Sequence, residues 1–363
     1  MKYYKIIFTL IFIVSFLSCI DEFNPKLDGK TRRLVIEANL TTKLDFHYVY
    51  LTFDAPYNST ASIFKDYVAD AKVKMIDNLG NEYLFFDDPT QNNMIKTSFG
   101  YNYRSVNKFK AEVGRTYQLF VETFDKKTYV SAPEKVLPVA PVENVKIDFE
   151  EINPASYVKG KFKVSVNVKD RAKENNYYKW DWYNVKQINW CREYTIGSAA
   201  GTLSYVDPCC ETCYQISPCI DCIELAQDKL IDGNVFNKPI TTIPFDDNTN
   251  YYLVVNQYSI SENAYKFWNA VKEQSKNSGG LFDAIPKSIK GNFKNAKDPK
   301  EEVLGYFTVS DVHEEIIIID RNLKSPKPYI IELYQPPWWV RTQKCFPCVE
   351  SYNRTKIKPK GWK

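Results

Sequence analysis

The stretch Lys72-Val73-Lys74-Met75-Ile76 is followed by Asp77-Asn78-Leu79-Gly80-Asn81 and then, after Glu82, by Tyr83-Leu84-Phe85-Phe86. The outer segments are rich in apolar, β-branched and aromatic residues, and the middle segment consists of residues that favour turns. This order predicts a β-hairpin. The segments 117–122 and 128–130 flank Asp125-Lys126-Lys127 in the same way and predict a second hairpin.

Short strand patterns of this kind recur from residue 31 to residue 140, without a convincing helix. Their number and spacing predict a β-sandwich of roughly immunoglobulin size. Pro133, Pro138 and Pro141 then interrupt the pattern. Because proline removes backbone donors and stiffens linkers, we place a domain boundary between residues 140 and 141.

A second β-rich domain is expected over residues 141–325, with a Cys-rich insertion at 191–223 that should interrupt its sheet. One helix is predicted at 261–276, because Ser261 is a good N-cap and Ala264, Phe267, Trp268 and Val271 lie on one helical face. A tail, 326–363, carries the C-x-x-C pair Cys345 and Cys348. The sequence therefore predicts an all-β fold of two immunoglobulin-like or fibronectin-like β-sandwich domains with one helical excursion.

Residues 1–18 have the pattern of a secretory signal peptide, with a basic start and the apolar run Ile6–Leu17. That run is too short to span a bilayer as a helix, which needs about 20 apolar residues. Cys19, directly after Leu17-Ser18, resembles the acylated cysteine of a bacterial lipobox. The alternative is an ordinary signal peptide. Residues 19–30 are polar and predict a flexible tether between lipid and first domain.

Asp21-Glu22 follows the predicted lipidation site. The pair resembles the acidic signal that sends lipoproteins of Bacteroidetes-type bacteria to the outer face of the outer membrane. The alternative is a solvated linker. We therefore expect an outer-membrane protein that is lipid-anchored, exposed on the cell surface and in contact with the membrane through its N-terminal lipid.

The composition of the 363-residue chain excludes some partners and favours strands. Its net charge of +4 is small, and lysines are interspersed with acidic residues, so no basic stripe predicts a nucleic-acid partner. The chain has 26 Tyr, 22 Phe and 7 Trp against 3 Met and 2 His. Aromatic enrichment of this kind favours strands over helices.

Eight cysteines remain after Cys19, and an even number in an exported chain predicts disulfides. Two other interpretations are a zinc site, which C-x-x-C pairs favour in reducing compartments, and a redox-active C-x-x-C. The pairing cannot be deduced, but adjacent Cys209 and Cys210 are expected to have different partners. The disulfide candidates are Cys191, Cys209, Cys210, Cys213, Cys219, Cys222, Cys345 and Cys348.

Catalytic patterns are not found in the sequence. His313-Glu314-Glu315 begins like a zinc-protease motif, but Ile317 stands at the position of the second histidine. His47 lies in an alternating strand pattern and is interpreted as structural. Adjacent acidic pairs such as Asp87-Asp88 are interpreted as solvated turn and edge residues. We therefore expect no enzyme activity, no catalytic residue, no metal and no cofactor.

Aromatic residues are the best candidates for recognition, because exposed Trp and Tyr give a large contact area at low entropic cost. Trp180 and Trp182 lie on the strand pattern 177–183, and Trp338 and Trp339 follow two prolines in the tail. These four residues are the predicted binding residues. The alternative for each pair is that it fills a core.

A series of short motifs, in their order along the chain, resembles the Bacteroidetes lipoprotein family catalogued as domain of unknown function 4249. The resemblance covers nearly the whole mature chain and implies an outer-membrane lipoprotein, often found alongside TonB-dependent transporters, with no established activity. Its motifs are residues 34–38, 111–117, 176–180, 280–283, 289–292, 303–307, the closing C-x-x-C and 358–362. Where family members tend to be glycine-rich after that C-x-x-C, this chain has Glu350-Ser351-Tyr352-Asn353-Arg354.

The function that these observations favour is a non-catalytic binding or accessory component of a TonB-dependent uptake system, with a β-barrel transporter as its partner. One alternative is a structural or adhesive surface lipoprotein without a transporter. The second alternative is a surface hydrolase, which would need a nucleophile or acid–base pair that the sequence does not identify.

Overall fold

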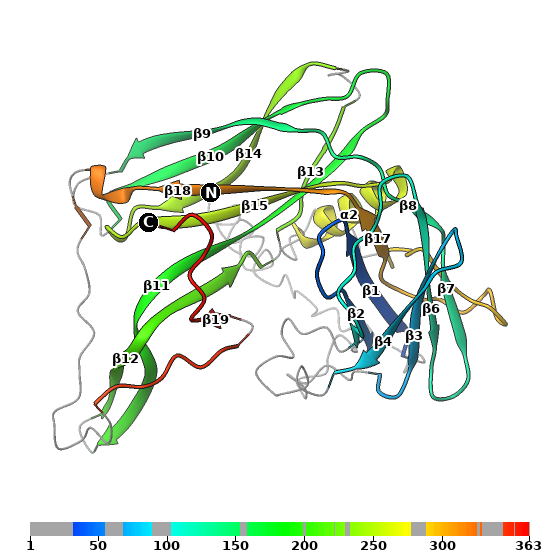
Figure 1. The fold of residues 1–363 in the computed structure, drawn as a ribbon, viewed down its shortest axis with the longest axis horizontal. Coiled ribbons are helices and arrows are strands. Elements are labelled where there is room, and N and C mark those ends of the chain that lie inside the picture. The colour runs from blue at the N-terminus through cyan, green and yellow to red at the C-terminus, as the bar shows by residue number, and fades with distance from the viewer. Residues whose placement is uncertain are drawn as a thin grey trace, which may run out of the picture.

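The computed structural model describes most of the chain after the predicted tether, and it is almost entirely β (Figure 1). The described residues are 32–54, 68–88, 103–152, 158–198, 201–220, 222–228, 233–276, 288–324, 327–328, 344–351 and 353–362. The signal peptide, Cys19, the tether and the pair Trp338 and Trp339 lie outside this part of the chain.

The first sheet has ten strands. Both predicted hairpins are confirmed, since β3 pairs with β4 and β6 pairs with β7 in antiparallel register. At the first turn, the Asp77 carboxylate accepts hydrogen bonds from the backbone N–H groups of Leu79 and Asn81, and Gly80 adopts a φ of +85°. The strands are β1 (Leu34–Thr41), β2 (Tyr48–Phe53), β3 (Lys72–Asp77), β4 (Glu82–Asp87), β5 (Tyr103–Ser105), β6 (Thr116–Glu122), β7 (Thr128–Ser131), β8 (Glu134–Lys135), β16 (Phe293–Asn295) and β17 (Phe307–Ser310).

Strands β16 and β17 come from residues that the sequence analysis placed in the second domain. β16 pairs with β7 at one edge of the first sheet, and β17 pairs in parallel with β1 at the other. The side chain of Asn292 joins these edges. Its Nδ2 donates to the Phe307 carbonyl and its Oδ1 accepts from the Phe307 N–H, both at 2.9 Å. The sheet is thereby closed on itself around a core that includes Leu40, Met75 and Leu119.

The second unit is a sandwich of two sheets. One has three strands, and the other continues from β18 through β15 and β11 to β12 and β19, with β13 beside β11. Trp180, Phe162 and Phe245 are among the buried residues between the two sheets. The strands are β9 (Val142–Glu151), β10 (Gly160–Lys169), β14 (Val235–Pro244), β11 (Tyr177–Ser198), β12 (Gly201–Pro218), β13 (Glu224–Gln227), β15 (Tyr251–Ser259), β18 (Val312–Ile319) and β19 (Arg354–Thr355).

The Cys-rich segment does not interrupt the sheet, which corrects the sequence-based expectation. Strand β11 continues through Cys191 and pairs with β12 from Tyr183 to Ser198, with register shifts on both sides of Trp190; β12 contains Cys209, Cys210 and Cys213. The result is a hairpin of 22- and 18-residue strands that extends well beyond the sandwich (Figure 1).

The predicted helix is confirmed as α2 (Glu262–Ser275). The Ser261 hydroxyl caps it by accepting a hydrogen bond from the Ala264 N–H at 3.2 Å, and Lys276 is the C-cap. In the described part of the chain, no helix has the length and apolar character required to cross a membrane. α2 packs between the two units, beside the first sheet (Figure 1).

Candidate functional site

An open groove of about 450 Å³ lies between α2 and the first sheet. Aromatic and aliphatic side chains form most of its wall, with a few polar side chains at its rim. Its lining residues are Arg33, Val35, Glu37, Phe267, Trp268, Val271, Gln274, Ser288, Ile289, Leu304, Gly305 and Tyr306. Grooves with apolar walls and a few polar groups are typical of ligand-binding sites.

The residues Leu304-Gly305-Tyr306, which lead into β17, line the groove from the side of the first sheet. Their backbone runs alongside β1, with the Ile36 N–H donating to the Leu304 carbonyl at 2.9 Å. Gly305 has a φ of +86°, and a Cβ at this position would lie 2.1 Å from the Ile36 carbonyl oxygen. Only glycine permits this close approach, so Gly305 allows the backbone that lines the groove to lie directly against β1.

The aromatic wall comes from α2. The Phe267 ring lies 5.3 Å from that of Trp268, edge to face, and 4.9 Å from that of Tyr306. The indole N–H of Trp268 donates to the Thr308 hydroxyl at 3.3 Å. The Lys179 ammonium lies 5.3 Å from the Trp268 ring centroid, within cation–π range. These contacts hold the aromatic side chains in place before any ligand binds.

The described lining of the groove includes one basic and one acidic side chain, Arg33 and Glu37. Arg33, directly before β1, pairs with Asp54 at 2.8 Å and with Glu302 at 2.9 Å, and Glu37 lies on β1. The hydrogen bond to Glu302, followed by that to Asp54, raises the pKa of Arg33 against the effect of burial. Because Arg33 is already paired with two carboxylates, it offers an anionic ligand little uncompensated positive charge.

Behind the groove, Tyr306 reaches a buried carboxyl group. Its hydroxyl donates to Glu134 Oε1 at 2.6 Å, and Asn292 donates to the same oxygen at 3.3 Å. Burial raises the pKa of Glu134 above its ordinary value, and burial also raises the pKa of Tyr306. The cluster therefore ties the groove to the side chain that closes the first sheet.

The predicted binding residues Trp180 and Trp182 do not line the groove. Trp180 is fully buried and its indole N–H donates to Gln257 Oε1 at 3.0 Å, so it fills the second core and is not a surface for a ligand. Trp182 is half-buried against the same core. Phe267 and Trp268 line the groove, but the sequence analysis assigned them only to a packing face of the helix. Their amphipathic spacing was the one sequence feature that pointed to this aromatic side of the groove.

The eight cysteines form four disulfides, as predicted. The adjacent pair has different partners, Cys209 with Cys191 and Cys210 with Cys345. Cys213 pairs with Cys348, and Cys219 pairs with Cys222. Two of these bonds fasten the C-terminal segment to β12 across 135 residues of sequence.

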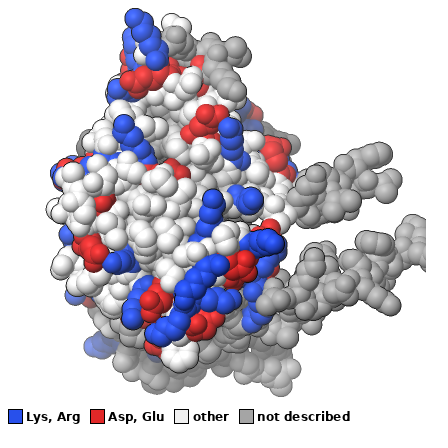
Figure 2. Space-filling model, turned by 90° about the vertical axis from the view of Figure 1, so that its right-hand side faces the viewer, with Lys and Arg blue, Asp and Glu red and all other residues white. Residues whose placement is uncertain are grey.

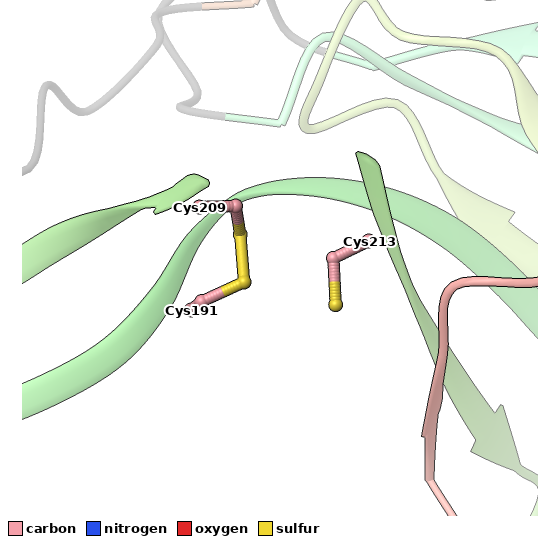
Figure 3. Close-up of side chains that lie close together, drawn as sticks. All are labelled: Cys191, Cys209 and Cys213. Carbon is pink, nitrogen blue, oxygen red and sulfur yellow. A yellow bond between two sulfur atoms is a disulfide. The ribbon is translucent and has the colours of Figure 1, made fainter. Parts of the chain in front are cut away.

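Three cysteine sulfurs lie close enough together that their separation would allow them to share a metal ion. The sulfurs of Cys191, Cys209 and Cys213 are all within 4.8 Å of one another. Figure 3 shows the bond between the sulfurs of Cys191 and Cys209, with the Cys213 side chain beside it. A sulfur in a disulfide is not a thiolate ligand, so this oxidised arrangement does not present a zinc site.

The two histidines lie apart, His47 directly before β2 and His313 on β18. His47 is 4% exposed, its Nε2 lies 2.9 Å from the Phe109 carbonyl, and burial lowers its pKa. His313 on β18 lies 3.3 Å from Glu315. Neither lines the groove.

Charge is mixed on the face of the molecule drawn in Figure 2, where basic and acidic side chains lie interspersed. This face therefore offers no broad basic surface of the kind that binds nucleic acid.

Comparison with known proteins supports the family resemblance and goes no further. No curated protein matches the chain. A family model does match, over residues 20–316, which include the first sheet, α2 and the hairpin. The chain therefore belongs to the family described as a domain of unknown function, DUF4249.

Proposed function

We propose that this protein is a lipid-anchored protein of the outer-membrane surface and a non-catalytic, ligand-binding accessory component of a TonB-dependent uptake system. The groove beside α2 is the observation that carries the proposal. Its described lining residues are pre-arranged, and among them there is no histidine, cysteine or lysine. Among the described lining residues, the serine hydroxyl is that of Ser288, which is hydrogen-bonded to Glu302 and Arg33 rather than to a histidine.

The location rests on two lines of support. The sequence Leu17-Ser18-Cys19-Ile20-Asp21-Glu22 combines a lipobox-like cysteine with an acidic pair. Four disulfides in the folded chain fit an oxidising environment outside the cytoplasm.

Co-purification tests the accessory role. The wild-type protein, extracted with mild detergent from outer membranes of its native host, should bring a TonB-dependent β-barrel with it. Protease added to intact cells should degrade the protein. Recovery of a surface-exposed protein without any barrel would favour the structural or adhesive alternative, and full protection from protease would refute surface exposure.

Substitutions in α2 test the groove. Val271→Arg should fill the groove, whereas Ala270→Arg places the same side chain on an exposed position that does not line it. Small molecules released by denaturing each purified protein are then compared by mass spectrometry. A compound present in wild type and Ala270→Arg but lost in Val271→Arg supports binding in the groove. Equal compound profiles for all three proteins would refute it.

A further inference from the structure

The C-terminal segment 353–362, here called the strap, is fixed to the second unit at several points. It follows the Cys210–Cys345 and Cys213–Cys348 disulfides, and its strand β19 pairs with β12. Figure 1 shows this segment running beside the hairpin towards β15. A chain terminus is usually poorly ordered unless it is tied down, so these attachments set the strap apart from an ordinary tail.

The end of the strap is held as firmly as its start. Trp362 packs on Tyr214 and Tyr252, with ring centroids 5.2 and 5.7 Å apart. The Tyr252 hydroxyl donates to the Lys360 carbonyl at 2.6 Å. Gly361 has a φ of +77°, and the Trp362 N–H donates to the Pro359 carbonyl, which closes a tight turn.

Between these attachments the strap presents positive charge and apolar surface together. Lys356, Lys358 and Lys360 are exposed, and Ile357 is 73% exposed. The strap itself contains no acidic residue, and the nearest in sequence, Glu350, accepts a hydrogen bond from the Lys356 backbone N–H at 2.8 Å. Among the described residues, no carboxylate forms an ion pair with any of these three lysines. Trp362 covers the aromatic residues of β12 and β15, which accounts for its own position. That structural role does not account for the exposed lysines and Ile357.

We propose that the strap is a docking surface for the anionic headgroups of a lipid bilayer. Clustered lysines near an anionic membrane each add to its affinity, and an exposed apolar side chain among them enters the interface. The lysines supply charge complementarity and Ile357 supplies the apolar contact. This inference rests on the membrane location proposed above, to which it adds a second, electrostatic attachment besides the lipid.

Vesicle flotation tests the strap without the acyl chain. The mature chain carrying Cys19→Ala is mixed with vesicles of equal parts phosphatidylglycerol and phosphatidylcholine, or with phosphatidylcholine alone. We expect binding to the anionic vesicles only, and loss of that binding in 0.5 M salt, because screening shortens the reach of charge. Binding to neither vesicle type, or equally to both, would overturn the proposal.

Two matched triple variants distinguish an effect of the strap lysines on vesicle binding from an effect of the protein's net charge. Replacing Lys356, Lys358 and Lys360 together by glutamine should weaken binding about 100-fold, at roughly fivefold per lysine. Replacing the exposed residues Lys294, Lys297 and Lys300 by glutamine changes the net charge equally and should leave binding within about threefold of the parent protein. Equal losses in the two variants would show that only net charge matters.

Ile357→Ser tests the apolar contribution and should weaken binding about fivefold. No change would remove the apolar contact from the proposal. The vesicle assay contains no transporter, so a negative result would overturn the strap proposal alone. Absence of a co-purifying barrel would instead overturn the accessory role and leave vesicle binding unaffected.

Discussion

Replacing Asn292 by alanine should open the first sheet at the place where its two edges meet. The Asn292 side chain makes two hydrogen bonds of 2.9 Å to the backbone of Phe307, a residue that is fully buried. Each such bond contributes about 1 kcal/mol, and a buried backbone group left without a partner costs about 1–3 kcal/mol. We therefore expect the opening free energy at β17 to fall by about 2–3 kcal/mol.

Hydrogen exchange measures this local effect directly. A fall of 2–3 kcal/mol corresponds to exchange that is about 30- to 150-fold faster for amides around Phe307, at a factor of ten per 1.4 kcal/mol. Mass spectrometry of a peptide that spans residues 303–311 resolves such a change. Amides of the second unit should keep their wild-type rates.

Asn237→Ala is the matched control. The Asn237 amide also donates two hydrogen bonds, to Ser165 Oγ at 3.0 Å and to Asn167 Oδ1 at 2.8 Å, but these bonds are exposed and water can replace them. Exchange in β14 should therefore change less than threefold. If Asn292→Ala accelerates exchange at Phe307 no more than Asn237→Ala does in its own strand, the closure of the sheet does not depend on this side chain.

Three further predictions follow from single groups. Burial lowers the pKa of His47, so the free energy of unfolding should fall as the pH drops below 6.5, where the unfolded chain takes up a proton that the folded protein resists. His47→Gln should reduce this dependence of the unfolding free energy on pH, measured by urea unfolding. An unchanged pH dependence would contradict the lowered pKa of His47. Replacing Cys210, Cys213, Cys345 and Cys348 together by serine removes both crosslinks that span 135 residues and should cost about 5 kcal/mol, with proteolysis beginning in the C-terminal segment; a wild-type digestion pattern would show that the two crosslinks are dispensable. Cys19→Ala should move the protein out of the membrane fraction or leave it unprocessed, and a processed, lipid-modified variant would exclude the lipobox interpretation.

The local parts of the fold could be predicted because their causes are local. The turn from Asp77 to Gly80 and the cap at Ser261 depend on residues within a few positions of each other. The pairing of β17 with β1 joins residues that lie more than 260 positions apart in the sequence, and neither strand carries a pattern that names its partner. Sequence periodicity therefore located these strands without showing that they share a sheet.

The aromatic residues show the same limit at the candidate site. Alternation along β11 separates its two faces, but it does not say which face another sheet covers. Trp180 faces the second core, and the face of the helix that carries Trp268 meets the first sheet incompletely and leaves a groove. The two tryptophans differ through what packs against them, which is a property of the tertiary structure.

The groove and the residues that lead into the strap depend on different kinds of stabilisation. The groove is lined by α2, β1 and residues 288–306, none of which contains a cysteine, and the first sheet behind it has a continuous apolar core. Around the hairpin crosslinks the buried apolar cluster is small and consists mainly of the cysteines themselves. Reduction should therefore loosen the segment from Cys345 to Cys348 and leave the groove intact, because that segment relies on crosslinks in place of a core, whereas the strap beyond it keeps the packing of Trp362. Oxidation therefore secures the residues that lead into the strap, while the groove belongs to a unit whose core contains no cysteine.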